Sequence, residues 1–138
     1  TICCLDLIKE YNIPAWVSFV LKDAGHILSG ESLISAIKSI EKYNIQYLLI
    51  NCNSLKRTYK AFEIISENWS SKWGFYPNFG IGEPDPDGII NEISKDDEFI
   101  DLINHAITSG ASLIGGCCGS SPKHIKLIKD YINSHFEK

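Results

Sequence analysis

Short apolar runs alternate along this chain with segments that have the spacing of amphipathic helices. Strands are expected at four runs, which cover residues Ala15–Val20, Tyr47–Asn51, Trp73–Tyr76 and Ala111–Ile114. Helices are expected over Cys3–Tyr11 and then after each strand, over Leu33–Lys42, Leu55–Ser66, Glu98–Thr108 and Pro122–Phe136. Strands that alternate with helices form parallel sheets. The pattern predicts an α/β fold whose four strand–helix units make about half of a (β/α)8 TIM barrel, a fold of roughly 250 residues.

A half barrel has two sheet edges without partners, and such edges are not stable alone. We interpret residues 1–138 as the C-terminal half of a barrel, with the N-terminal half absent from this chain. The missing half is then expected from other chain segments or from another copy in a homo-oligomer. The chain has no Met, even at position 1, which suggests a piece of a longer chain.

Composition limits the classes of partner. The chain has 44% hydrophobic and 22% charged residues, as ordinary globular proteins do. A net charge of −4 and the lack of a basic stripe argue against nucleic acid as the main partner. No apolar stretch approaches the roughly 20 residues that span a bilayer. No signal peptide is recognisable, so the expected location is the cytoplasm.

Three cysteines stand where two expected strands end. Cys52 follows the apolar run Tyr47–Ile50, and Cys117 and Cys118 follow the run Ala111–Ile114. In a parallel barrel all strands end on the same face, so these side chains can meet although they are far apart in sequence. Thiolates are good zinc ligands, and three protein ligands leave a fourth position open for substrate. The arrangement therefore points to a zinc site.

Other interpretations of the cysteines stay open at this point. Cys117 and Cys118 can instead be small buried residues at a tight turn, or an adjacent-pair disulfide, because adjacent cysteines depart from the usual spacings of metal ligands. Five cysteines without a secretory signal favour thiols or metal ligands over a disulfide framework. Cys3 and Cys4 are expected to pack as small buried hydrophobes.

The segment Gly115–Ile125, which reads GGCCGSSPKHI, resembles the Gly-Gly-Cys-Cys signature of the homocysteine S-methyltransferase family. Three other segments resemble that family in the same order. They are Ala15–Phe19 with Lys22-Asp23, Ile50–Cys52, and Tyr76–Asn78 with Gly80. The resemblance covers nearly the whole chain.

The resemblance implies a (β/α)8 barrel in which Cys52, Cys117 and Cys118 hold zinc, and in which zinc binds the homocysteine sulfur. A free thiol is mostly protonated at neutral pH, whereas a thiol bound to a metal is deprotonated. The thiolate would then take a methyl group from a sulfonium donor such as S-methylmethionine, giving methionine. No general base from the protein is implied. The family's other homocysteine-binding segments lie outside this chain.

Three departures from the family's pattern concern the donor and the pocket. Phe79 stands where many members have a small residue, Ser120-Ser121 replaces a commoner Thr-Thr, and Gly119 stands where some sulfonium-using members have Arg. A betaine- or folate-dependent homocysteine methyltransferase is therefore the alternative within the enzyme class. A non-catalytic zinc or redox domain on the same fold is the alternative outside it.

The remaining polar residues give weaker predictions. Asn78 is a candidate substrate-binding residue or a support of the metal site, or else it satisfies the backbone of its own turn. The four histidines, His26, His105, His124 and His135, are expected to be solvated. Acidic residues in and after the loop Gly80–Gly88 match no EF-hand pattern and are read as solvent-exposed. The aromatic residues Trp69, Trp73, Phe75 and Tyr76 are read as core or barrel wall.

Overall fold

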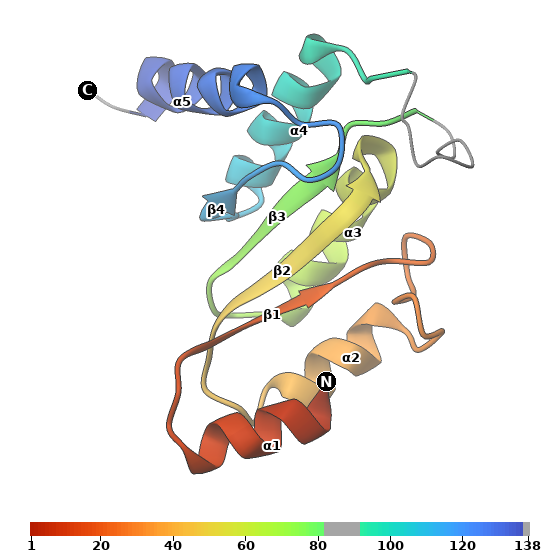
Figure 1. Cartoon of the computed structure of the whole chain (residues 1–138), viewed down its shortest axis with the longest axis vertical. Coiled ribbons are helices and arrows are strands. Elements are labelled where there is room, and N and C mark those ends of the chain that lie inside the picture. The colour runs from red at the N-terminus through yellow and green to blue at the C-terminus, as the bar shows by residue number, and fades with distance from the viewer. Residues whose placement is uncertain (82–91, 137–138) are drawn as a thin grey trace.

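A computed structural model describes residues 1–81 and 92–136 of the chain and contains the expected alternation of strands and helices (Figure 1). The strands are β1 (Ala15–Phe19), β2 (Ile45–Ser54), β3 (Trp73–Asn78) and β4 (Leu113–Ile114). The helices are α1 (Ile2–Glu10), α2 (Leu33–Ile40), α3 (Leu55–Asn68), α4 (Asp96–Thr108) and α5 (Pro122–Phe136). The α/β prediction is confirmed.

The strands form one parallel sheet in the order β1-β2-β3-β4. Each strand therefore pairs with the next one along the chain, as in one arc of a barrel. The carboxyl ends of the four parallel strands lie on the same side of the sheet, where the segments that follow β2, β3 and β4 come near one another (Figure 1). Residues at these ends are placed to form a site.

The core lies between the sheet and its helices. Alternate residues of β1, namely Ala15, Val17 and Phe19, are buried in it, whereas Trp16 and Ser18 are exposed on the opposite face. The helices contribute the residues of their apolar faces, such as Leu33, Ile37 and Ile40, Phe62 and Ile65, and Phe99, Leu102 and Ile103. In a complete barrel the face opposite the helices is the interior. We call it the inner face below.

Helix boundaries follow local chemistry. The side chain of Ser32 accepts a hydrogen bond from Ser35 N–H at the start of α2, and Ser54 does the same for Arg57 N–H at the start of α3. Acidic residues occupy the first turn of α4, where the helix dipole favours negative charge. Gly110, with φ +94°, follows that helix and reverses the chain toward β4, as expected.

The structure corrects one prediction in this region. Cys3 and Cys4 are exposed rather than packed, because the buried side of α1 is made by Leu5 with the partly buried Ile2 and Ile8. Trp69, Trp73 and Phe75 are buried as expected, and Tyr76 is half-buried on the inner face. The acidic loop predicted at Gly80–Gly88 lies largely outside the described residues. No helix within residues 1–81 and 92–136 combines the length and apolarity needed to cross a bilayer.

Candidate metal centre

Cys52 lies at a break in the regular pairing of β2. The register between β2 and β3 shifts between Asn51 and Ser54, and Cys52 has φ +56°. A left-handed conformation costs roughly 1–2 kcal/mol for a residue with a Cβ atom. Asn53 offsets this cost by donating a hydrogen bond from Nδ2 back to Asn51 O at 2.8 Å. Bulges of this kind re-aim a side chain away from the direction that a regular strand would give it.

The segment that carries Cys117 and Cys118 is fixed to the end of β3. Cys117 N–H donates to Pro77 O at 2.9 Å, and Phe79 N–H donates to Cys118 O at 2.9 Å. A Cβ atom on Gly116 would lie 2.7 Å from Ser120 Cβ, and Gly119 has φ +73°. Glycine fits both positions, because a side chain would be crowded at Gly116 and strained at Gly119. The two hydrogen bonds fix the turn against the end of β3.

The three predicted sulfur ligands meet. Cys52 Sγ lies 3.6 Å from Cys118 Sγ, which lies 3.9 Å from Cys117 Sγ. All three sulfurs lie within 4.8 Å of one another. Zinc–sulfur bonds of about 2.3 Å in a tetrahedron separate the sulfurs by about 3.8 Å. The donor set therefore fits a tetrahedral metal ion, and all five cysteines are free of disulfides.

Burial and neighbouring thiols favour the protonated form of Cys52. Partial burial, followed by hydrogen bonds with the Cys117 and Cys118 thiols, raises the pKa of Cys52 to about 12. At neutral pH the thiol of the metal-free chain is thus protonated. A metal ion that binds here must displace that proton.

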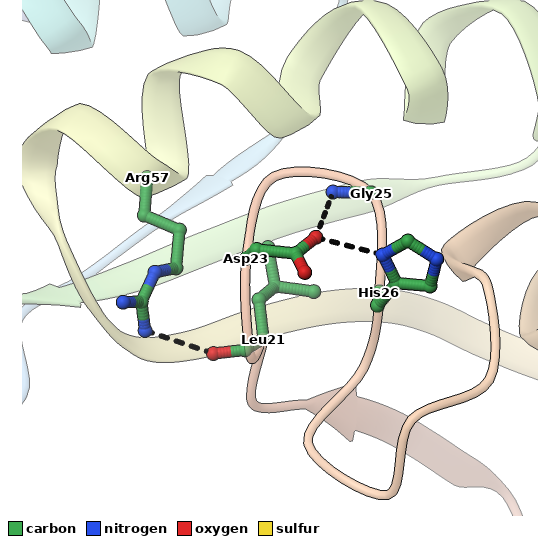
Figure 2. Close-up of polar contacts among 5 residues, drawn as sticks. All are labelled: Leu21, Asp23, Gly25, His26 and Arg57. Carbon is green, nitrogen blue, oxygen red and sulfur yellow. Dashed lines mark hydrogen bonds and ion pairs between the residues drawn. The ribbon is translucent and has the colours of Figure 1, made fainter.

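The loop that follows β1 is tied to the segment that carries Cys52. Leu21 N–H donates to Asn53 Oδ1 at 2.8 Å. Arg57 Nη1 donates to Leu21 O at 3.0 Å (Figure 2). Farther along this loop, Asp23 Oδ1 contacts both Gly25 N and His26 Nδ1, each at 2.9 Å (Figure 2). The contact with His26, more than that with Gly25, lowers the pKa of Asp23. The start of this loop and the segment that carries Cys52 are therefore joined by hydrogen bonds.

Asn78 makes a contact within its own turn. Its Oδ1 accepts a hydrogen bond from Gly80 N–H at 2.8 Å. The side chain therefore bonds to the backbone of its own turn, which was one of the alternatives for Asn78. This bond leaves open the substrate contact that the sequence suggested, and Asn78 stays a candidate.

The prediction that all four histidines are solvated is wrong for two of them. His124 is buried because its ring fills the space beside Phe79, at a centroid distance of 4.1 Å, and its Nδ1 accepts from Ser121 N–H at 2.9 Å. His105 is half-buried, stacks on Tyr59 at 4.0 Å and has a buried Nε2 without a hydrogen-bond partner among the described residues. His26 and His135 are exposed.

Two elements of the site were missed in the sequence. Asn53 is buried and bonded on both sides of its amide, and Ser18, Asn51 and Tyr76 form a hydrogen-bonded chain on the inner face. The asparagines on either side of Cys52 were the available signal, because buried amides need partners.

Known proteins match this chain over nearly its whole length. It is 31% identical over 140 residues to homocysteine S-methyltransferase 3 of Zea mays, covering 97% of this chain and 41% of that protein. It is 30% identical over 139 residues to selenocysteine methyltransferase of Astragalus bisulcatus, covering 94% of this chain and 40% of that protein.

The fold is shared with solved structures. The metallated form of the homocysteine methyltransferase MmuM from Escherichia coli superposes with a TM-score of 0.76 and 27% identity, covering 92% of this chain and 39% of that one. The chain thus spans about two fifths of the length of these relatives, and its fold is a partial barrel. The family model described as homocysteine S-methyltransferase matches residues 1–132, and the chain belongs to that family.

Proposed function

We propose that this protein is part of a zinc-dependent homocysteine S-methyltransferase that takes its methyl group from a sulfonium donor such as S-methylmethionine. The convergence of three cysteine sulfurs at the spacing of a tetrahedral ion supports this most strongly. Membership of the family supports the substrate class, and the metallated form of a structural relative supports a metal.

Cys52, Cys117 and Cys118 would hold the ion. Zinc bound there would supply Lewis acidity that deprotonates a substrate thiol and holds it as a thiolate. The hydrogen bonds that join the Cys117–Cys118 segment to β3, with the bulge of β2, would hold the three sulfurs near one another before the ion binds. Among the described residues no fourth Cys, His, Asp or Glu joins the cluster, which leaves one tetrahedral position for the substrate.

The reaction balances as a simple displacement. The homocysteine sulfur forms a bond to the methyl carbon while the bond from that carbon to the donor sulfonium breaks. The electron pair of the broken bond stays on the donor sulfur, which leaves as a neutral thioether. The thiol proton goes to solvent. With S-methylmethionine as donor, both products are methionine.

The rest of the barrel is part of the proposal. We place residues 1–138 in the C-terminal half, with the remaining strands supplied by other segments or by a second copy. Asn78 would contact substrate through the part of its amide that does not bind Gly80. The cytoplasm is the proposed compartment, because three adjacent thiols persist in a reducing environment.

Methyl transfer to homocysteine tests the proposal on the intact, zinc-loaded protein. S-methylmethionine, betaine and a methylated folate are supplied in separate reactions, and methionine is quantified. The proposal predicts transfer from S-methylmethionine that is lost in Cys118→Ser and kept in Cys4→Ser, whose cysteine is exposed and outside the cluster. Transfer from betaine or folate alone would contradict the sulfonium donor. Zinc binding without transfer from any donor would favour the non-catalytic domain.

A further inference from the structure

Three polar side chains from three neighbouring strands form a hydrogen-bonded chain on the inner face. Tyr76 of β3 donates from its hydroxyl to Ser18 Oγ of β1 at 2.9 Å, and Ser18 donates to Asn51 Oδ1 of β2 at 2.6 Å. These residues are 33 and 58 positions apart in sequence, so the fold alone brings them together. Side chains linked in this way are held in fixed orientations.

The direction of the hydrogen bonds fixes the amide of Asn51. A tyrosine and a serine each have one hydroxyl proton, and both protons are used in the chain. Because Oδ1 of Asn51 accepts from Ser18, its Nδ2 keeps two N–H donors. Within residues 1–81 and 92–136 this Nδ2 makes no hydrogen bond. Asn51 is half-buried, so a ligand that enters from the inner face can reach it.

The polar chain is linked to both parts of the sulfur cluster. Asn51 directly precedes Cys52, and Asn53 Nδ2 donates to Asn51 O across the Cys52 position. Tyr76 directly precedes Pro77, whose carbonyl accepts from Cys117 N–H at 2.9 Å. The Nδ2 donors of Asn51, which make no hydrogen bond within the described residues, therefore belong to the segments that carry the sulfurs.

We propose that Asn51 is a substrate-binding residue whose Nδ2 donates to the carboxylate of an α-amino acid, with Ser18 and Tyr76 as positioning residues. This inference rests on the proposed function, in which both the acceptor and a sulfonium donor carry such a carboxylate. A carboxylate only accepts hydrogen bonds, and the Asn51 amide offers it two N–H donors. Because the amide is already oriented, little conformational entropy is lost when the carboxylate binds. The polar chain keeps the amide oxygen, which would repel the carboxylate, turned toward Ser18.

Paired substrates with and without the carboxylate test the inference. For the acceptor, homocysteine is compared with 3-mercaptopropylamine, which has the same thiol arm and amine. For the donor, S-methylmethionine is compared with (3-aminopropyl)dimethylsulfonium. Asn51→Asp keeps the shape and the acceptor for Ser18 but removes both N–H donors and adds a charge that repels the carboxylate. Tyr76→Phe removes the first hydroxyl of the chain, and Tyr11→Phe, at an exposed tyrosine, is the matched control.

The expected result is selective. Asn51→Asp raises KM about 10- to 100-fold for the substrate whose carboxylate is bound, the effect of losing a hydrogen bond to a charged group. For the paired compound that lacks the carboxylate, Asn51→Asp changes KM by less than about 3-fold. Tyr76→Phe shifts KM in the same direction by a smaller factor, with kcat and zinc content preserved, and Tyr11→Phe changes nothing. The affected pair identifies the acceptor or the donor as the source of the carboxylate.

Two results would overturn the inference. Equal loss for substrates with and without the carboxylate, or loss of zinc from Asn51→Asp, makes Asn51 only a support of Cys52. If the wild-type protein transfers no methyl group, the proposed function fails first. The inference is then tested by calorimetry, which measures the affinity of the zinc-loaded protein for methionine and for 3-(methylthio)propylamine, which lacks the carboxylate. Tighter binding of methionine that Asn51→Asp abolishes supports it, and equal binding of the two ligands overturns it.

Discussion

Replacing Gly116 by alanine should disturb the sulfur cluster without touching a sulfur. The new Cβ atom would lie 2.7 Å from Ser120 Cβ, 3.0 Å from Ser120 Oγ and 3.3 Å from Phe79 Cε2. Carbon atoms in contact lie about 3.5–4.0 Å apart, so the turn must open by about 1 Å. Rotation of the serine side chain cannot relieve a contact to its Cβ. The strain should move Cys117 and Cys118, which lie between the two contacting residues in the chain.

The substitution should change two quantities, the free energy of unfolding and the affinity for zinc. Overpacking of this kind costs about 1–3 kcal/mol of the free energy of unfolding. Metal–ligand distances tolerate shifts of only about 0.2 Å, so zinc affinity should fall at least about 10-fold. Gly25→Ala is the matched control, because its Cβ would meet only Asp23 Oδ1, at 3.8 Å. That substitution should change the free energy of unfolding by less than about 0.5 kcal/mol.

Two measurements check this prediction. Zinc affinity is measured by competition with a chromophoric chelator, and the free energy of unfolding of the metal-free protein is measured by urea titration. Wild-type zinc affinity in Gly116→Ala, together with a stability equal to that of Gly25→Ala, would refute the reasoning that the turn holds the cluster.

Three further predictions concern the thiols and the helix beside them. The pKa of Cys52 is raised from 9.0 to about 12, so between these pH values the native metal-free chain binds more protons than the unfolded chain. Its free energy of unfolding should therefore fall as pH rises through that window. Urea midpoints at pH 8 and 10 are compared for the wild type and Cys52→Ala, and a difference between the two proteins that does not change with pH would contradict this prediction. After zinc removal in air, Cys52 should form a disulfide with Cys118 in preference to Cys117, because their sulfurs already lie 3.6 Å apart; peptide mapping identifies the pair, and three reduced thiols would count against convergence. His124→Ala should lower the free energy of unfolding by about 2–4 kcal/mol through lost packing and the unpaired Ser121 N–H, whereas His135→Ala, at an exposed site, should change it by less than about 0.5 kcal/mol; equal effects of the two substitutions would show that the His124 ring is solvated.

Much of the fold was predictable because hydrophobic periodicity and parallel topology constrain it. The expected strand at Trp73–Tyr76 became Trp73–Asn78, and the expected helix at Leu55–Ser66 became Leu55–Asn68. Ends of this kind depend on caps and turns more than on periodicity. The meeting of Cys52 with Cys117 and Cys118 was also predictable, since parallel strands end on one face.

Other features depend on tertiary packing that periodicity does not encode. The ring of His124 packs against Phe79, a residue 45 positions earlier, and no local sequence pattern predicts that contact. The exposure of Cys3 and Cys4 follows from which side of α1 faces the core, and the helix is too short to fix that from its own sequence. The left-handed conformation of Cys52 is accompanied by the bonds of the Asn53 amide, which accepts from Leu21 N–H and donates to Asn51 O.

The zinc content of the reduced, intact protein tests the central claim most directly. We expect about one zinc ion per chain in the wild type and in Cys4→Ser, as for a single three-thiolate site, and a collapse of that ratio in Cys118→Ser. X-ray absorption at the zinc edge should then give sulfur neighbours at about 2.3 Å. A wild-type protein that is folded and free of metal after exposure to zinc, or a Cys118→Ser variant that keeps its full zinc content, would contradict the account.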